Sequence, residues 1–122
     1  MKMLLAVLLL LASLRDGHAD ELTTHDIAWE TVYQSLLVVD WAQTLELSRL
    51  CQSRIRGVQE VNPILGPCPT PGRVNAWFIG ASIGHVVALN LLPRSGRRPL
   101  QMLTIGIQLS SVSANFSLGL GF

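Results

Sequence analysis

The sequence predicts an all-α protein, a membrane-embedded three-helix bundle that follows an N-terminal signal peptide. Residues 74–92 run for 19 positions without Asp, Glu, Lys or Arg, and such a helix nearly crosses the roughly 30 Å hydrocarbon core of a bilayer. Residues 100–122 also lack charged side chains. Charged residues make up only 14% of the 122-residue chain, whereas about a quarter of a soluble domain is charged.

The first element, residues 1–19, has the features of a secretory signal peptide. Lys2 precedes an apolar run over residues 3–14, and the segment ends in Gly-His-Ala at 17–19. A charged start, an apolar run too short to span a membrane and a small-x-small end are typical of a leader that is cleaved after this tripeptide. The charged pair at 15–16 leaves an uncleaved anchor as the alternative.

The domain that follows, residues 20–122, begins with a predicted helix at about 24–52. Thr23 and Asp26 suit a helix N-terminus, and arginines follow near the other end. Whether this helix spans the membrane is left open. On insertion scales, Asp40 in the middle of this helix disfavours membrane insertion by about 2.5–3.5 kcal/mol. The surrounding Leu and Val residues favour insertion by roughly the same amount. We therefore expect it to insert only beside helices that accept its polar face.

A connection rich in proline and glycine, residues 53–72, precedes the second predicted helix at 74–92. The motif Gly80-x-x-x-Gly84 within this helix permits close approach of a neighbouring helix. The third helix is predicted at 99–118, because its first residue is a proline, which fits the first helical position. A frayed or extended tail is expected after it.

Polar side chains recur on one face of each predicted helix at steps of three and four residues. An unpaired polar group that faces lipid costs several kcal/mol, so these faces are expected to turn inward and form a polar seam. The candidate seam or site residues are Asp40, Thr44, Glu60, Asn62, His85, Gln101, Gln108 and Asn115.

Asp40 and His85 are the ionisable residues deepest in the apolar segments, and an antiparallel hairpin would place them at similar depth. Such residues are functional candidates by default, although a structural contact that sets helix register is the first interpretation. Glu60 is expected to cap its own loop; alternatively it joins Asp40 and His85 as a third metal ligand. No phosphate, dinucleotide or HExxH motif is present, so we expect no cofactor and assign no catalytic residue.

Cys51 and Cys68 could close a disulfide worth roughly 3 kcal/mol, and free thiols are the alternative. If the leader is cleaved and the first helix spans, both cysteines lie in the reducing cytoplasm. This arrangement is slightly favoured, because the first helix carries a polar face like the other two. If that helix lies on the surface, or the leader stays as an anchor, the loop is periplasmic and the disulfide can form.

Charge is unevenly distributed along the chain. Residues 20–60 carry seven acids and three arginines, a net −4, and residues 61–122 carry four arginines and no acid, a net +4. The arginines flank apolar helices and form no basic stripe, so the expected partner is membrane lipid and not nucleic acid. The chain lacks the alternating strands of a barrel, so we expect an exported protein of a bacterial inner membrane rather than the outer one.

Two runs, D-W-x-Q-T at 40–44 and E-x-N-P-x-L-G at 60–66, are followed by Asn75, Phe78 and His85. Leu92-Pro93, Arg97 or Arg98, and Gln101 complete the pattern. This combination resembles an uncharacterised family of small bacterial and phage-borne membrane-associated proteins. The resemblance covers about residues 25–122. It implies that these positions form one linked site or core, and it implies no activity.

The function expected from these features is that of a small, non-enzymatic membrane protein. It would act through helix contacts, either with a second copy of itself or with another membrane protein. The alternative is a membrane-embedded, metal-dependent hydrolase that uses Asp40, Glu60 and His85.

Overall fold

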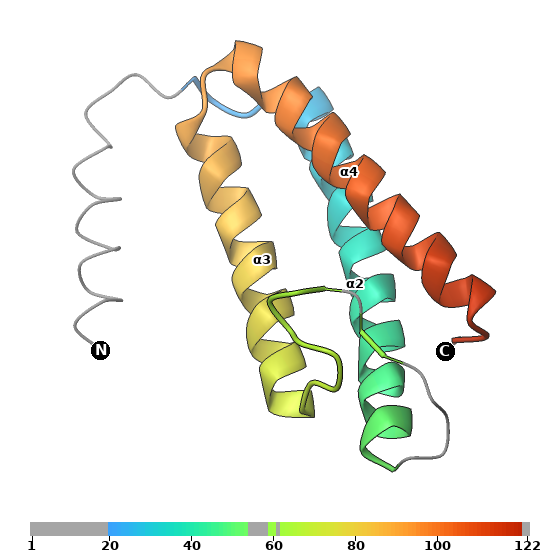
Figure 1. Ribbon diagram of the computed structural model, residues 1–122. Coiled ribbons are helices and arrows are strands. Elements are labelled where there is room, and N and C mark those ends of the chain that lie inside the picture. Colours follow the sequence, from blue (N-terminus) through green and yellow to red (C-terminus); the bar gives the residue numbers. More distant parts are fainter. Residues whose placement is uncertain (1–19, 54–58, 61, 121–122) are drawn as a thin grey trace, which may run out of the picture.

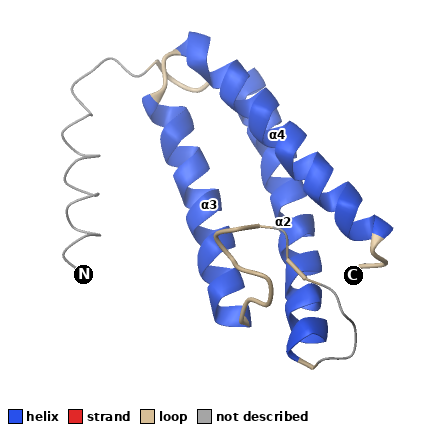
Figure 2. Ribbon diagram, viewed as in Figure 1, coloured by secondary structure: helices blue, strands red, loops and turns tan. Residues whose placement is uncertain are grey.

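A computed structural model describes residues 20–53, 59–60 and 62–120 (Figure 1). Within these residues the chain forms three helices, α2 (Thr24–Gln52), α3 (Pro71–Leu91) and α4 (Arg94–Ser117), and no strand (Figure 2). The all-α prediction is confirmed. The predicted signal peptide, residues 1–19, lies outside the described residues.

The central element of the fold is α2, which packs against both α3 and α4. The other two helices leave their short connection at one end of α2 and diverge toward the opposite end (Figure 1). The loop that joins α2 to α3 folds back beside the open end. Buried apolar side chains from α2, this loop and α3 form the main core: Tyr33, Leu37, Leu65, Val74 and Phe78.

Side-chain caps set where α2 and α3 begin. The Thr23 hydroxyl accepts a hydrogen bond from the Asp26 amide (3.1 Å), and the Asp26 carboxylate accepts one from the Thr23 amide (2.9 Å). This capping box satisfies two amides that a helix start leaves without partners. At α3, Thr70 accepts from the amide of Arg73 and Pro71 occupies the first helical position. The cap therefore starts α3 three residues before the predicted residue 74.

The α4 helix starts at Arg94, five residues before the predicted residue 99. The Gly96 amide donates to the carbonyl of Pro93 at 2.9 Å, so the first turn has already formed when the chain reaches Pro99. A proline in the second turn removes a single early amide donor. The prediction placed Pro99 at the first helical position, and the structure accommodates it inside the helix.

The frayed or extended tail expected after α4 is not found at residues 118–120, where a Schellman motif ends the helix; residues 121–122 lie outside the described part of the chain. Gly119 adopts a φ of +76°, its amide donates to the carbonyl of Phe116, and the Leu120 amide donates to Asn115. These are the two hydrogen bonds of the motif, and a left-handed glycine is what it requires. Leu120 is consequently buried against Leu47 and Leu50 of α2.

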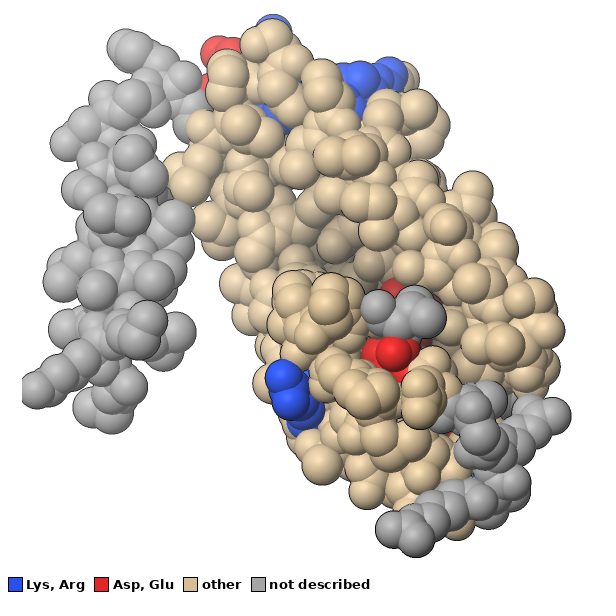
Figure 3. Space-filling view, viewed as in Figure 1, with Lys and Arg blue, Asp and Glu red and all other residues tan. Residues whose placement is uncertain are grey.

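Among the described helices, only α3 is long and apolar enough to cross a membrane by length and composition. Its mean hydropathy is 1.4, and 22% of the apolar window is buried inside the protein. Large apolar side chains are nevertheless exposed on every helix, including Val38 (59%), Ile83 (60%) and Leu109 (53%). The face seen in Figure 3 carries its basic side chains toward two ends, and most of the surface between them is uncharged apart from a small group of acidic atoms.

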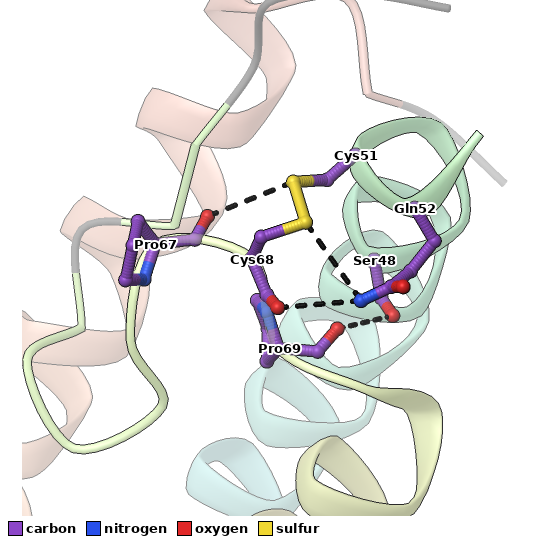
Figure 4. The surroundings of a disulfide bond; sticks show 6 residues. All are labelled: Ser48, Cys51, Gln52, Pro67, Cys68 and Pro69. Carbon is purple, nitrogen blue, oxygen red and sulfur yellow. Dashed lines mark hydrogen bonds between the residues drawn. A yellow bond between two sulfur atoms is a disulfide. The ribbon is translucent and has the colours of Figure 1, made fainter. Parts of the chain in front are cut away.

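The α2–α3 loop is tied to the end of α2 by a disulfide between Cys51 and Cys68 (Figure 4). The Ser48 hydroxyl donates to the carbonyl of Pro69 at 2.7 Å, and the side-chain amide of Gln52 donates to the carbonyl of Cys68 at 3.3 Å. Of the two cysteine states left open by the sequence, the structure contains the bonded one. The cross-link and these two hydrogen bonds hold the loop against the last turns of α2.

Candidate functional site

Polar side chains from all three helices meet along the inner face of α2 at three levels. The first level surrounds Arg97 near the start of α2, the second surrounds His85, and the third surrounds Asp40. We call them the Arg97, His85 and Asp40 levels. Together they form the interhelical polar seam that the stripes in the sequence predicted.

At the Arg97 level, a fully buried guanidinium joins the start of α2 to the α3–α4 connection. Arg97 donates to the Asp26 carboxylate at 3.1 Å. It also donates to four backbone carbonyl groups, those of Asp20, Glu21, Leu89 and Leu92. Gln101, a predicted seam residue, donates to the carbonyl of Asp26 at 2.9 Å. The arginine thus satisfies carbonyl groups from two separate parts of the chain.

Arg97 is not among the candidate seam residues, because the arginines were expected to anchor helix ends at the membrane surface; only the family resemblance included Arg97, with Arg98 as the alternative. A signal was nevertheless present. Arg97 lies four residues before Gln101, and positions four apart share a helix face. The polar stripe of α4 therefore begins one turn earlier than predicted.

Asp26 is held in its ionised form at this level. The hydrogen bond from the Thr23 amide is the largest effect and lowers the pKa of Asp26 below its ordinary value of 3.8. Burial, the second largest effect, opposes it, and the Thr23 hydroxyl and the Arg97 guanidinium lower the pKa further. A carboxylate with a lowered pKa in the folded protein adds stability above its unfolded pKa. That stability is lost as the pH falls through the folded pKa.

We therefore expect the stability of the protein to fall as the pH drops below about 4. An Asp26→Asn variant should be less stable at neutral pH and should lose less stability on acidification. Chemical unfolding followed by circular dichroism at several pH values checks this. Parallel pH profiles for the two proteins would contradict the role assigned to Asp26.

At the His85 level, a buried imidazole bridges all three helices. Its Nδ1 lies 2.8 Å from the Glu30 carboxylate of α2, and its Nε2 lies 2.9 Å from the Thr104 hydroxyl of α4. The Tyr33 ring stacks on the imidazole with centroids 3.8 Å apart. Because a carboxylate only accepts, Nδ1–H donates to Glu30. These contacts hold the imidazole in place between the three helices. They suit the first interpretation of His85, a structural contact that sets helix register.

The hydrogen bonds around Glu30 extend along α2 and across to α3. Gln34 donates to the Glu30 carboxylate at 2.7 Å, and the Ser82 hydroxyl donates to the Gln34 side-chain oxygen at 2.8 Å. Neither Glu30 nor Gln34 was among the candidate residues. Glu30 lies on the polar stripe of α2, at helical spacing from Tyr33, and Gln34 follows it by four residues, so the sequence did hold a signal for both.

At the Asp40 level, α2, α4 and the α2–α3 loop enclose a cavity of about 300 Å³. Asp40 is 8% exposed. Its Oδ1 accepts a hydrogen bond from the side-chain amide of Asn115 at 2.9 Å and lies 3.5 Å from the Thr44 hydroxyl. The polar side chains that line the cavity are Asp40, Thr44, Glu60, Asn62, Ser111 and Asn115. In Figure 3, acidic atoms are visible between α3 and α4.

Glu60 makes the loop-capping contacts expected of it, and it does not join His85. Its carboxylate accepts from the Asn62 amide at 2.9 Å, and the Asn62 side chain accepts from the Ile64 amide at 3.0 Å. These contacts shape the loop, as expected for a side chain that caps a turn. Glu60 also lines the same cavity as Asp40.

The structure does not bring Asp40, Glu60 and His85 together. His85 contacts Glu30, which precedes Asp40 by ten residues of α2, about 15 Å along the helix axis. The expectation of similar depth for Asp40 and His85 is therefore wrong. Among the described residues, no group of three or more His, Cys, Asp or Glu is placed to hold a metal ion.

Gln108, another candidate, lies on α4 between the His85 and Asp40 levels. Its side-chain oxygen is buried and has no hydrogen-bond partner within the described part of the chain. The same is true of the side-chain oxygen of Gln43, which is fully buried. Both side chains belong to the polar seam, but their side-chain oxygens make no hydrogen bond with the other candidate residues.

Trp41 connects the cavity wall to α3. Its indole N–H donates to the Asn75 side chain at 2.8 Å, and its ring stacks parallel to Phe78 with centroids 6.0 Å apart. Phe78 in turn lines the cavity. The two sequence runs and Asn75 are therefore joined around one location. Comparisons with family models, curated proteins and solved structures give no match to this chain.

Proposed function

We propose that this protein is a membrane-embedded three-helix bundle that acts without catalysis, through helix contacts in the membrane. The supporting observation is the distribution of polarity between the exposed helix faces and the interhelical seam. Large apolar side chains are exposed on all three helices, while Asp40, His85 and Arg97 are buried with polar partners. This distribution suits lipid, where polar groups must be satisfied internally.

Helix length and pairing support the insertion of α2 and α4 beside α3. The shortest of the three helices, α3, has 21 residues, about the 30 Å of the hydrocarbon core at 1.5 Å per residue. The cost of inserting Asp40 is reduced by the hydrogen bond from Asn115 of α4. A helix that inserts poorly alone gains a partner for its polar group within the bundle.

The disulfide supports a topology in which the α2–α3 loop faces an oxidising compartment. Disulfides persist in the periplasm and are rare in the cytosol. The Cys51–Cys68 bond therefore favours the periplasmic loop over the cytoplasmic loop that the sequence slightly favoured. With α2 inserted, the Arg97 level at its other end then faces the cytoplasm, so the proposal takes the alternative in which the leader is not cleaved after residue 19. This arrangement agrees with an inner-membrane location.

The outward face of α3 is the surface that we propose for helix contacts. Gly80 and Gly84 are both exposed, and a Cβ atom added at either would meet no atom within 4 Å. Exposed Ile79 and Ile83 flank them. The Gly-x-x-x-Gly motif thus makes no close approach within this bundle and is open to a helix from a second copy or from another membrane protein.

Replacing both glycines with leucine should weaken self-association in reconstituted bilayers by at least about tenfold, or about 1.4 kcal/mol. Leucine side chains would keep the two backbones apart, while the open surroundings leave the monomer fold intact. Energy transfer between labelled copies measures this. Gly106→Leu is the matched control, since that glycine is also exposed and open. Equal association of all three proteins would contradict self-association through this face.

A metal-dependent hydrolase is not favoured as the second candidate. That function needs His85 beside Asp40 and Glu60, and His85 contacts Glu30 and Thr104 instead. The cavity at the Asp40 level retains its two carboxylates without an imidazole.

A further inference from the structure

Asp40 differs from the other two acids of the seam, Asp26 and Glu30, in its partners. Asp26 contacts the Arg97 guanidinium at 3.1 Å, and Glu30 contacts His85 at 2.8 Å. Both hydrogen bonds to Asp40 instead come from the neutral side chains of Asn115 and Thr44. Within the described part of the chain, no cationic side chain lies within ion-pairing distance of Asp40.

The second oxygen of Asp40 is also available to a ligand. Both hydrogen bonds end on Oδ1, and no described residue donates to Oδ2. Asp40 is more than nine-tenths buried and lines the cavity. A buried carboxylate is costly unless it is paired. An unfilled carboxylate oxygen that borders a cavity therefore points to a ligand of opposite charge.

The other polar groups of the cavity restrict the chemistry of that ligand. Glu60 supplies a second carboxylate, Asn62 and Asn115 supply amides, and Thr44 and Ser111 supply hydroxyls. All of their acceptor atoms are oxygens, which hard cations such as Ca²⁺ and Mg²⁺ prefer, and soft cysteine or imidazole ligands are not among them. A volume of about 300 Å³ also leaves room for water on the ion, because each water needs about 30 Å³.

We propose that this cavity binds one hydrated, hard divalent cation, with Asp40 and Glu60 as its anionic ligands. Glu60 and Asn62 come from the loop, whereas Asp40 and Asn115 come from α2 and α4. The ion would therefore join the loop to the open end of the bundle. This site is independent of helix contacts through α3, so neither proposal depends on the other.

Terbium luminescence tests the site in the purified, disulfide-bonded full-length protein in detergent micelles. Trp41 stacks on Phe78 in the cavity wall and is placed to sensitise bound Tb³⁺. We expect saturable sensitised emission that Ca²⁺ or Mg²⁺ displaces and K⁺ does not. The thermal midpoint should be higher in the displacing divalent ion than in EDTA, since a ligand that binds only the folded state stabilises it.

Three variants decide between a built site and adventitious binding. Asp40→Asn and Glu60→Gln should each weaken displaceable Tb³⁺ binding by at least about tenfold, and both should abolish the divalent-ion increase in the thermal midpoint. Glu46→Gln is the control, because Glu46 pairs with Arg49 on the surface and its loss should change neither. If Asp40→Asn does not fold, the loop variant Glu60→Gln decides. Absence of saturable emission, or unchanged binding in Glu60→Gln, would overturn the proposal.

Discussion

Replacing Arg97 with methionine is expected to lower the free energy of unfolding by about 3–5 kcal/mol, the range for breaking a buried charge pair. The side chain is fully buried and donates to the Asp26 carboxylate and to four backbone carbonyl groups. Methionine retains much of the length and removes every donor. Arg97→Lys should recover only part of the loss, because one ammonium with three donors cannot reproduce the guanidinium fork. Denaturant unfolding in micelles, followed by circular dichroism, measures these differences.

Arg98→Met is the matched control for this experiment. Arg98 is exposed, and its guanidinium lies 4.9 Å from the centroid of the Trp29 ring. An exposed cation–π contact contributes about 0.5–1 kcal/mol. A loss at Arg97 no larger than the loss at Arg98 would contradict the stabilising role of the contacts at the Arg97 level.

Removing the disulfide should have the second largest effect. The Cys51→Ser, Cys68→Ser double variant is expected to lose about 3 kcal/mol, as the chain-entropy estimate gives for a loop of this length; the two cysteines are 17 positions apart. The loss should also loosen the loop that carries Glu60 and Asn62, two residues of the cavity wall. Unfolding of the wild type with and without reductant measures the effect.

The double variant also supplies the control for that measurement. Reductant should destabilise the wild type and leave the variant unchanged, because it has no disulfide to reduce. A wild type whose unfolding does not respond to reductant, although mass spectrometry shows free thiols, would contradict the stabilising role of the cross-link.

The helices and the polar seam could be predicted because both depend on local patterns. Caps at Thr23 and Thr70 and the proline-rich loop limit where helices start and end. The spacing of Gln101, Asp40 and Asn115 on their helices identified faces that do meet in the structure. Such periodicity reports which face of a helix is buried. Periodicity does not report which residue of the neighbouring helix lies opposite a given position.

The register between α2 and α3 could not be predicted for that reason. Asp40 and His85 are both central in their helices, yet His85 lies opposite Glu30. The loop folds back along the end of α2 and is held there through Ser48 and Gln52, so it sets an offset that helix length does not encode. Long-range contacts also determine the depth of Arg97, whose carbonyl partners come from two separate segments.

Nitroxide labels at one exposed apolar position on each helix test the membrane-embedded bundle most directly. Val38, Ile83 and Leu109 are suitable sites, since each is more than half exposed. A cysteine introduced there is selectively reactive, because the native pair is disulfide-bonded and no free cysteine is described. In vesicles, all three labels should collide more with lipid-soluble oxygen than with a water-soluble nickel chelate, and a label at exposed Arg98 should show the reverse. Nickel access at Val38 and Leu109, with Ile83 alone in lipid, would contradict the embedded three-helix bundle.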